Sequence, residues 1–75
     1  MQSNMLKSKI ALAGINQERL AEMMGANGAS IDRATLNQKI NAKREFNQSE
    51  IKALIDALKL SNEEAIEIFF TSNVS

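Results

Sequence analysis

A chain of 75 residues has room for one domain, and a domain of this size buries only about 60% of the surface of its unfolded chain. The absence of cysteine and histidine excludes disulfides and a Cys/His metal site, so the core must come from the apolar residues, 44% of the chain. The net charge is zero, but the charged residues are unevenly distributed along the chain. Residues 1–44 carry seven cations and three carboxylates, whereas residues 45–75 carry two cations and six carboxylates, so a polyanion would prefer the first part.

Four helix starts share one sequence pattern. Each has a polar N-cap residue with an apolar residue just before it and another four positions later, which together form a hydrophobic staple. These N-caps are Asn16, Asp32, Asn47 and Ser61. The last two also have a glutamate three positions later, as in a capping box. With a first helix that precedes Gly14, the pattern predicts five helices.

The predicted helices cover residues 5–13, 17–24, 33–41, 48–59 and 62–70. Helical spacing assigns each an apolar stripe. In chain order the stripe residues are Leu6, Ile10 and Ala13; Leu20, Ala21 and Met24; Leu36 and Ile40; Ile51, Leu54, Ile55 and Leu58; and Ala65, Ile66 and Phe69. Gly14 and Gly25 are expected to end the first two helices, and the tail 71–75 is expected to be loose. No segment alternates as a strand does, so the predicted fold class is all-α.

Catalytic residues are scarce. There is no histidine, cysteine, tyrosine or tryptophan, no glycine loop for a phosphate, and no base beside a serine. Helix capping explains most of the carboxylates. We therefore expect a protein that is not an enzyme and has no cofactor or metal. Without an apolar export signal or a membrane-spanning run, we also expect a cytoplasmic protein with no membrane partner.

The second and third predicted helices suggest a DNA-binding unit. The third helix has a narrow core stripe, and its other faces carry groups that hydrogen-bond base edges or phosphates. The expected base-reading residues, on its first two turns, are Arg33, Ala34, Asn37 and Gln38. The expected phosphate-binding residues are Gln17, Lys39, Lys43 and Arg44.

Two segments carry a family resemblance. GINQERLAEMMG at residues 14–25 resembles the "GITQEELAEKLG" block of the Cro/CI helix-turn-helix family, and ATLNQKIN at residues 34–41 resembles its recognition helix. Residues 46–70 resemble the two closing helices, and the ending EIFF is most similar to small Cro-like regulators of Gram-positive bacterial phages, among them the modulator-of-repression proteins. The resemblance implies a single five-helix Cro/CI-type (lambda-repressor-like) domain over residues 1–75. Its helix-turn-helix would span residues 17–41 and its closing helices 48–70.

The turn departs from the family pattern because residues 28–32 are inserted between Asn27 and Arg33. These residues either prolong the third helix or lengthen the turn. As helix, Ile31 would lie about 140° from Leu36, off the core stripe. A longer turn that ends in the Ile31/Asp32 staple is therefore the better interpretation. It brings the Asp32 carboxylate to the DNA-facing edge.

Two functions follow from these observations. The first is a transcriptional regulator that binds double-stranded operator DNA in a host bacterial cell, at a phage lysis–lysogeny switch, with a homodimer as one option. The second is an antirepressor that binds a CI-type phage repressor and masks or alters its DNA contacts. The candidate dimer or partner contacts are Ile68, Phe70 and Val74. For Phe70, burial in the core beside Phe69 is an equally good interpretation.

Overall fold

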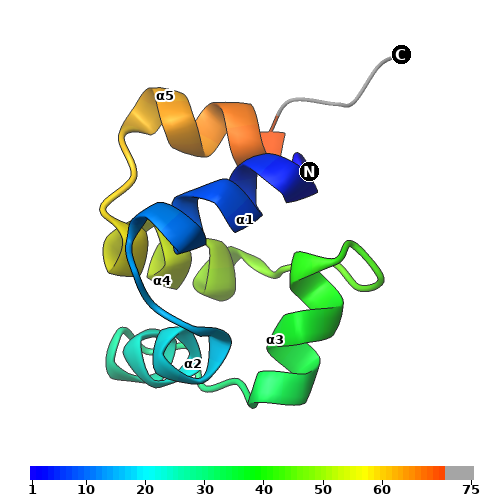
Figure 1. Ribbon diagram of the computed structural model, residues 1–75, viewed down its shortest axis with the longest axis vertical. Coiled ribbons are helices and arrows are strands. Elements are labelled where there is room, and N and C mark those ends of the chain that lie inside the picture. Colours follow the sequence, from blue (N-terminus) through cyan, green and yellow to red (C-terminus); the bar gives the residue numbers. More distant parts are fainter. Residues whose placement is uncertain (71–75) are drawn as a thin grey trace.

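The computed structural model describes residues 1–70, and within them every regular element is helical. The elements are α1 (Ser3–Leu12), α2 (Gln17–Ala26), α3 (Arg33–Ile40), α4 (Gln48–Leu58), α5 (Asn62–Ala65) and a π-helical turn, η1 (Ile66–Phe70), that continues α5. Figure 1 shows α2 and α3 together at one end of the long axis and α5 at the other, with α1 between them. The all-α prediction is confirmed. The expected tail, 71–75, lies outside the described residues.

All four predicted N-caps are confirmed. The side chain of Asn16 accepts a hydrogen bond from the backbone N–H of Arg19 at 2.8 Å, and Asp32 accepts one from Thr35 at 2.7 Å. The caps of α4 and α5 form complete capping boxes, in which the N-cap backbone N–H also donates to the glutamate three residues later. These starts were predictable because every partner lies within four residues.

The predicted end of α2 at Gly25 is wrong. Gly25 lies inside the helix, and the terminating glycine is Gly28, at φ +90°. The N–H of Ala29 donates to the carbonyl of Met24 at 2.9 Å, and that of Gly28 to Gly25 at 3.2 Å. This pattern is a Schellman motif, whose left-handed residue glycine adopts without a Cβ penalty. Gly28, the first residue of the segment 28–32, is thus the C-terminal stop of α2.

The interpretation of residues 28–32 as a longer turn is confirmed. Ala29 is buried at 5% exposure, Ile31 packs against the core, and Asp32 caps α3, which begins at Arg33. These five residues therefore contain the stop of one helix, two apolar anchors and the start of the next helix.

The core lies where α1, α2, α3, α4 and η1 meet. Its largest fully buried side chains are Leu6, Leu20, Met24, Leu36, Ile40, Leu54 and Ile68. They are mostly the predicted stripe residues, and a single cluster joins all of them. Removing one such side chain to alanine costs about 2–5 kcal/mol in a close-packed core.

Three stripe predictions are wrong in detail. Ala13 is exposed because α1 ends at Leu12. In α4, which packs against α2, the buried apolar positions are Ala53, Leu54 and Ala57, and the other predicted stripe residues are half-buried. In the last helix Ile66 is 56% exposed and Ile68 is buried. The residues from Ile66 to Phe70 form the π-helical turn η1, whose wider repeat departs from the α-helical spacing on which the predicted stripe was based.

Polar contacts join the N-terminal part of the chain to α3, α5 and η1. The N–H of Gln2 donates to the Ile68 carbonyl at 2.8 Å, and the Ser3 hydroxyl donates to the carbonyl of Ile40. Lys9 of α1 pairs with Glu64 of α5. Over residues 1–70, each helix is too short or too polar to cross a membrane.

Candidate nucleic-acid interface

The four expected base-reading residues are all exposed on α3. Leu36 and Ile40 point into the core, Ala34 and Gln38 lie on the opposite side of the helix, and Arg33 and Asn37 flank the core stripe. Because α3 begins at Arg33, the four residues occupy its first two turns, the part of a helix that enters a major groove most deeply.

Asn37 and Gln17 are directly joined. The Nδ2 group of Asn37 donates a hydrogen bond to Oε1 of Gln17 at 3.0 Å, which links α3 to the first residue of α2. The bond leaves Asn37 with one N–H and its carbonyl oxygen, the donor and acceptor pair that matches the edge of adenine. Gln17 keeps both amide N–H groups for an anionic oxygen.

A hollow of about 450 Å³ lies between α1, the start of α2 and α3. Polar side chains from all three helices surround it, namely Lys7, Asn16, Gln17, Arg33 and Asn37. Lys7 was not among the predicted site residues. Nothing near it in sequence marks it, since it reaches this place only because α1 packs against α3. Two cations, Lys7 and Arg33, thus border the Asn37–Gln17 pair.

Lys39 was expected to bind phosphate, and the structure contradicts this expectation. The residue is 8% exposed, and its Nζ donates to both carboxylate oxygens of Glu50, at 2.6 and 2.8 Å. Burial of Glu50 raises its pKa, but the hydrogen bonds from Lys39 and from the Asn47 backbone outweigh burial and hold the pKa below its ordinary value. Lys39 therefore fastens α3 to α4 and is not available to a ligand.

Lys43 and Arg44, the other predicted phosphate contacts, are exposed in the loop after α3. That loop begins with a second Schellman motif, because Ala42 donates to Lys39 at 3.1 Å and Lys43 to Gln38 at 2.9 Å. Ala42 occupies the left-handed position, at φ +61°. The motif turns the chain directly after α3, so both cations follow this helix closely.

One anionic group lies at the same edge. The Asp32 side chain is exposed, and hydrogen bonds from Thr35 lower its pKa, with a smaller contribution from the Arg44 charge. The carboxylate therefore stays ionised beside Arg33 at neutral pH. It offsets part of the cationic charge that a phosphate backbone would meet.

Of the predicted dimer or partner contacts, the prediction for Ile68 is wrong. It is completely buried, because η1 turns it toward α1, and it cannot contact another molecule. Phe70 is 64% exposed, and Val74 lies outside the described residues.

Neither a search for metal-ligand groups nor comparison with known proteins assigns a further role to these residues. In the described part of the chain no group of three or more Asp, Glu, Cys or His residues is placed to hold a metal ion. No family model, no curated protein and no solved structure matches the chain significantly. The site therefore has to be interpreted from its own geometry.

Proposed function

We propose that this protein is a transcriptional regulator that binds double-stranded DNA through a Cro/CI-type helix-turn-helix formed by α2 and α3. The observation that carries the proposal is the Asn37–Gln17 hydrogen bond, which fixes a base-reading amide against a phosphate-binding one. Arg33, Ala34 and Gln38 are also exposed on the first two turns of α3. Proteins of this kind act by binding, without a cofactor, in the cytoplasm of the bacterial cell.

The direct experiment is a selection from a library of random DNA duplexes. The pure chain retains bound duplexes on a filter, and the enriched sequences are read after several cycles. We expect enrichment of a short motif, and of two motifs about one helical turn apart if the chain binds as a symmetric dimer. No enriched motif after selection at low salt would contradict the proposal.

A second candidate function is an antirepressor that binds a CI-type phage repressor. The ionised Asp32 beside Arg33 favours it, since this charge weakens phosphate binding at the edge that would face DNA. The test needs the repressor from the neighbouring gene. Mixing the two proteins without DNA should give a complex in sedimentation analysis, and its absence at micromolar concentrations would exclude this function.

A further inference from the structure

The end of α2 contains the one asparagine of the chain that is followed by glycine. This dipeptide is Asn27–Gly28, and both residues are exposed. Deamidation of an asparagine is fastest before glycine, because glycine has no Cβ to hinder attack by its backbone nitrogen. The sequence therefore marks Asn27 as a candidate for a covalent change that needs no enzyme.

The reaction needs only water. The backbone nitrogen of Gly28 loses its proton to a base and attacks the Cγ carbon of Asn27. The N–Cγ bond forms, the Cγ–Nδ2 bond breaks, and the amide nitrogen leaves as ammonia after taking up one proton. Water then opens the cyclic imide at either carbonyl, which gives aspartate or an isoaspartate whose backbone runs through the side chain.

The folded end of α2 opposes this reaction in three ways. The Gly28 N–H is engaged as a donor to the Gly25 carbonyl, at 3.2 Å. The Asn27 side chain is held by a hydrogen bond from its Nδ2 to the Met23 carbonyl, at 2.8 Å. The backbone of Asn27, at ψ 16°, directs the Gly28 nitrogen away from the side chain that it would attack. Because all three restraints must be released together, the reaction requires the last turn of the helix to open.

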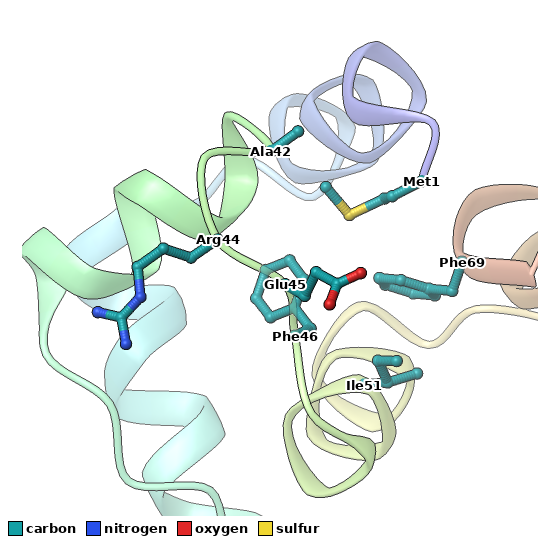
Figure 2. A pocket seen from close by; sticks show the side chains of 7 residues that line it. All are labelled: Met1, Ala42, Arg44, Glu45, Phe46, Ile51 and Phe69. Atoms are coloured by element: carbon teal, nitrogen blue, oxygen red, sulfur yellow. The ribbon is translucent and has the colours of Figure 1, made fainter.

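The end of α3 matches this arrangement with one difference. Asn41 has φ −87° and ψ 13°, against φ −98° and ψ 16° for Asn27, and its Nδ2 also donates to the carbonyl four residues earlier, at 2.8 Å. Each asparagine precedes a residue with positive φ, but after Asn41 this residue is Ala42. The Ala42 methyl group, which lines the pocket shown in Figure 2, is the Cβ that Gly28 lacks. The two helix ends thus share the same protection and differ in the residue that attacks.

We propose that Asn27 is a site of spontaneous deamidation, protected by the folded end of α2, and that the modification disrupts this helix end. The new carboxylate no longer donates to the Met23 carbonyl, and its charge lies where the helix dipole disfavours it. The isoaspartate product also adds a carbon atom to the backbone before Gly28, which breaks the spacing of the Schellman motif. The stability of α2 thus sets how long a chain keeps the turn between α2 and α3. This inference involves no expected DNA contact and stands independently of the proposed function.

The measurement is the deamidation rate of the full chain at mildly alkaline pH. Peptide mapping with mass spectrometry separates asparagine, aspartate and isoaspartate in samples incubated folded or in concentrated urea. We expect Asn27 to react at least about tenfold faster in urea, because the restraints of the helix end are then absent. Equal rates in the two samples would overturn the protection, and no modification of Asn27 in urea would overturn the site.

Asn41 is the internal control for the role of glycine. In urea it should react at least about tenfold more slowly than Asn27, because the Ala42 methyl group hinders the attack. Ala42→Gly should then raise the rate at Asn41 to within about twofold of that at Asn27. If Asn41 reacted as fast as Asn27 in the parent chain, glycine would not select the site and the proposal would fail.

Gly25→Ala tests the link to helix stability in the folded chain. Gly25 lies inside α2, and a Cβ there meets nothing within 4 Å. Alanine should stabilise the last turns of the helix and slow deamidation of Asn27 about two- to fivefold. An unchanged rate would show that opening of α2 does not control the reaction, and would overturn the protection.

Asn27→Asp reproduces one product and tests its effect on the helix end. Its melting temperature should lie about 4–8 °C below that of the parent, because α2 loses a hydrogen bond and gains an unfavourable charge. The control is Asn4→Asp, an exposed position in the first turn of α1, where the helix dipole favours a negative charge. This control should not lower the melting temperature. Equal melting temperatures of Asn27→Asp and the parent would overturn the proposed disruption of α2.

Discussion

The amide pair formed by Asn37 and Gln17 makes a prediction at the scale of single residues. We expect Asn37→Ala to cost about 1–3 kcal/mol of binding to the selected site and much less on random DNA, because it removes a donor and acceptor aimed at one base. Lys43→Ala, in an exposed loop residue, should weaken both duplexes alike. Mobility shifts on the two duplexes measure the difference. An equal loss on both for Asn37→Ala would exclude direct readout by this residue.

The Lys39–Glu50 pair makes a second residue-scale prediction, this time on stability. Lys39→Met should destabilise the fold by about 3 kcal/mol, because it leaves the Glu50 carboxylate buried without its cation. Urea unfolding monitored by circular dichroism gives the free energy. Lys43→Met, the nearby exposed lysine, is the control and should change stability by less than about 0.5 kcal/mol. Similar values for the two variants would contradict the structural role of Lys39.

At the scale of the elements, the two Schellman motifs differ in the residue at the left-handed position. Gly28 stands at the end of α2 and Ala42 at the end of α3. Ala42→Gly should raise the unfolding free energy by about 0.5–1 kcal/mol, and Gly28→Ala should lower it by about 1–2 kcal/mol. Gly25→Ala is the matched control. It should stabilise by about 0.5–1 kcal/mol, since a Cβ there meets nothing within 4 Å. Destabilisation by Gly25→Ala would instead restore Gly25 as the helix stop.

The contact between α1 and α5 predicts how stability depends on pH. The hydrogen bond from Lys9, followed by that from the Ser61 backbone, lowers the pKa of Glu64 from 4.5 to about 2. A carboxylate whose pKa is lower in the folded state contributes stability above its unfolded pKa and loses it as the pH falls through its folded pKa. The unfolding free energy should therefore decrease between about pH 4.5 and pH 2.

Glu64→Gln tests this dependence while keeping the cap, because glutamine also completes a capping box. Its unfolding free energy should fall less steeply over the same pH interval, measured by thermal melts in a pH series. Glu63→Gln, the exposed neighbour, should keep the slope of the parent chain. An unchanged slope in Glu64→Gln would show that the Lys9–Glu64 pair does not form in solution.

How much of each element could be predicted depends on the range of the interactions that define it. All four N-caps were predictable, because a cap, its partner and its staple lie within five residues. Helix ends were less predictable. At the end of α2, Gly25 and Gly28 are both glycines, and only the left-handed backbone conformation of Gly28 identifies it as the stop. The buried face of α4, which includes Ala53, was less predictable because it depends on packing against other helices, among them α2.

The candidate site divides in the same way. The exposed side of α3 followed from the spacing of Leu36 and Ile40, and the structure agrees. The position of Lys7 beside the site and the burial of Lys39 could not be predicted from local sequence, because each depends on residues from another helix. A lysine on a polar helix face and a lysine aimed at a buried carboxylate have the same local sequence, so only the tertiary arrangement distinguishes them.

At the scale of the whole molecule, the exposed cations predict the salt dependence of DNA binding. Four of them lie around α3, namely Lys7, Arg33, Lys43 and Arg44. If each neutralises one phosphate, the logarithm of the binding constant should fall with the logarithm of salt concentration with a slope of about −3 to −4. Lys7→Ala should reduce the magnitude of the slope by about one, measured by anisotropy over a salt series. Lys52→Ala, an exposed cation on α4, should leave it unchanged, and an equal effect of both would remove Lys7 from the interface.

The turn between α2 and α3 holds the stop of one helix and the start of the next within residues 28–32. Neither helix therefore depends on the other for its boundary. Within this turn the exposed Ser30 is the one residue that neither ends α2 nor starts α3. A cysteine introduced there would be unique in a chain that has none. It would give a single attachment point just before α3, from which a dye or a photocrosslinker could report directly what this part of the surface touches in a living cell.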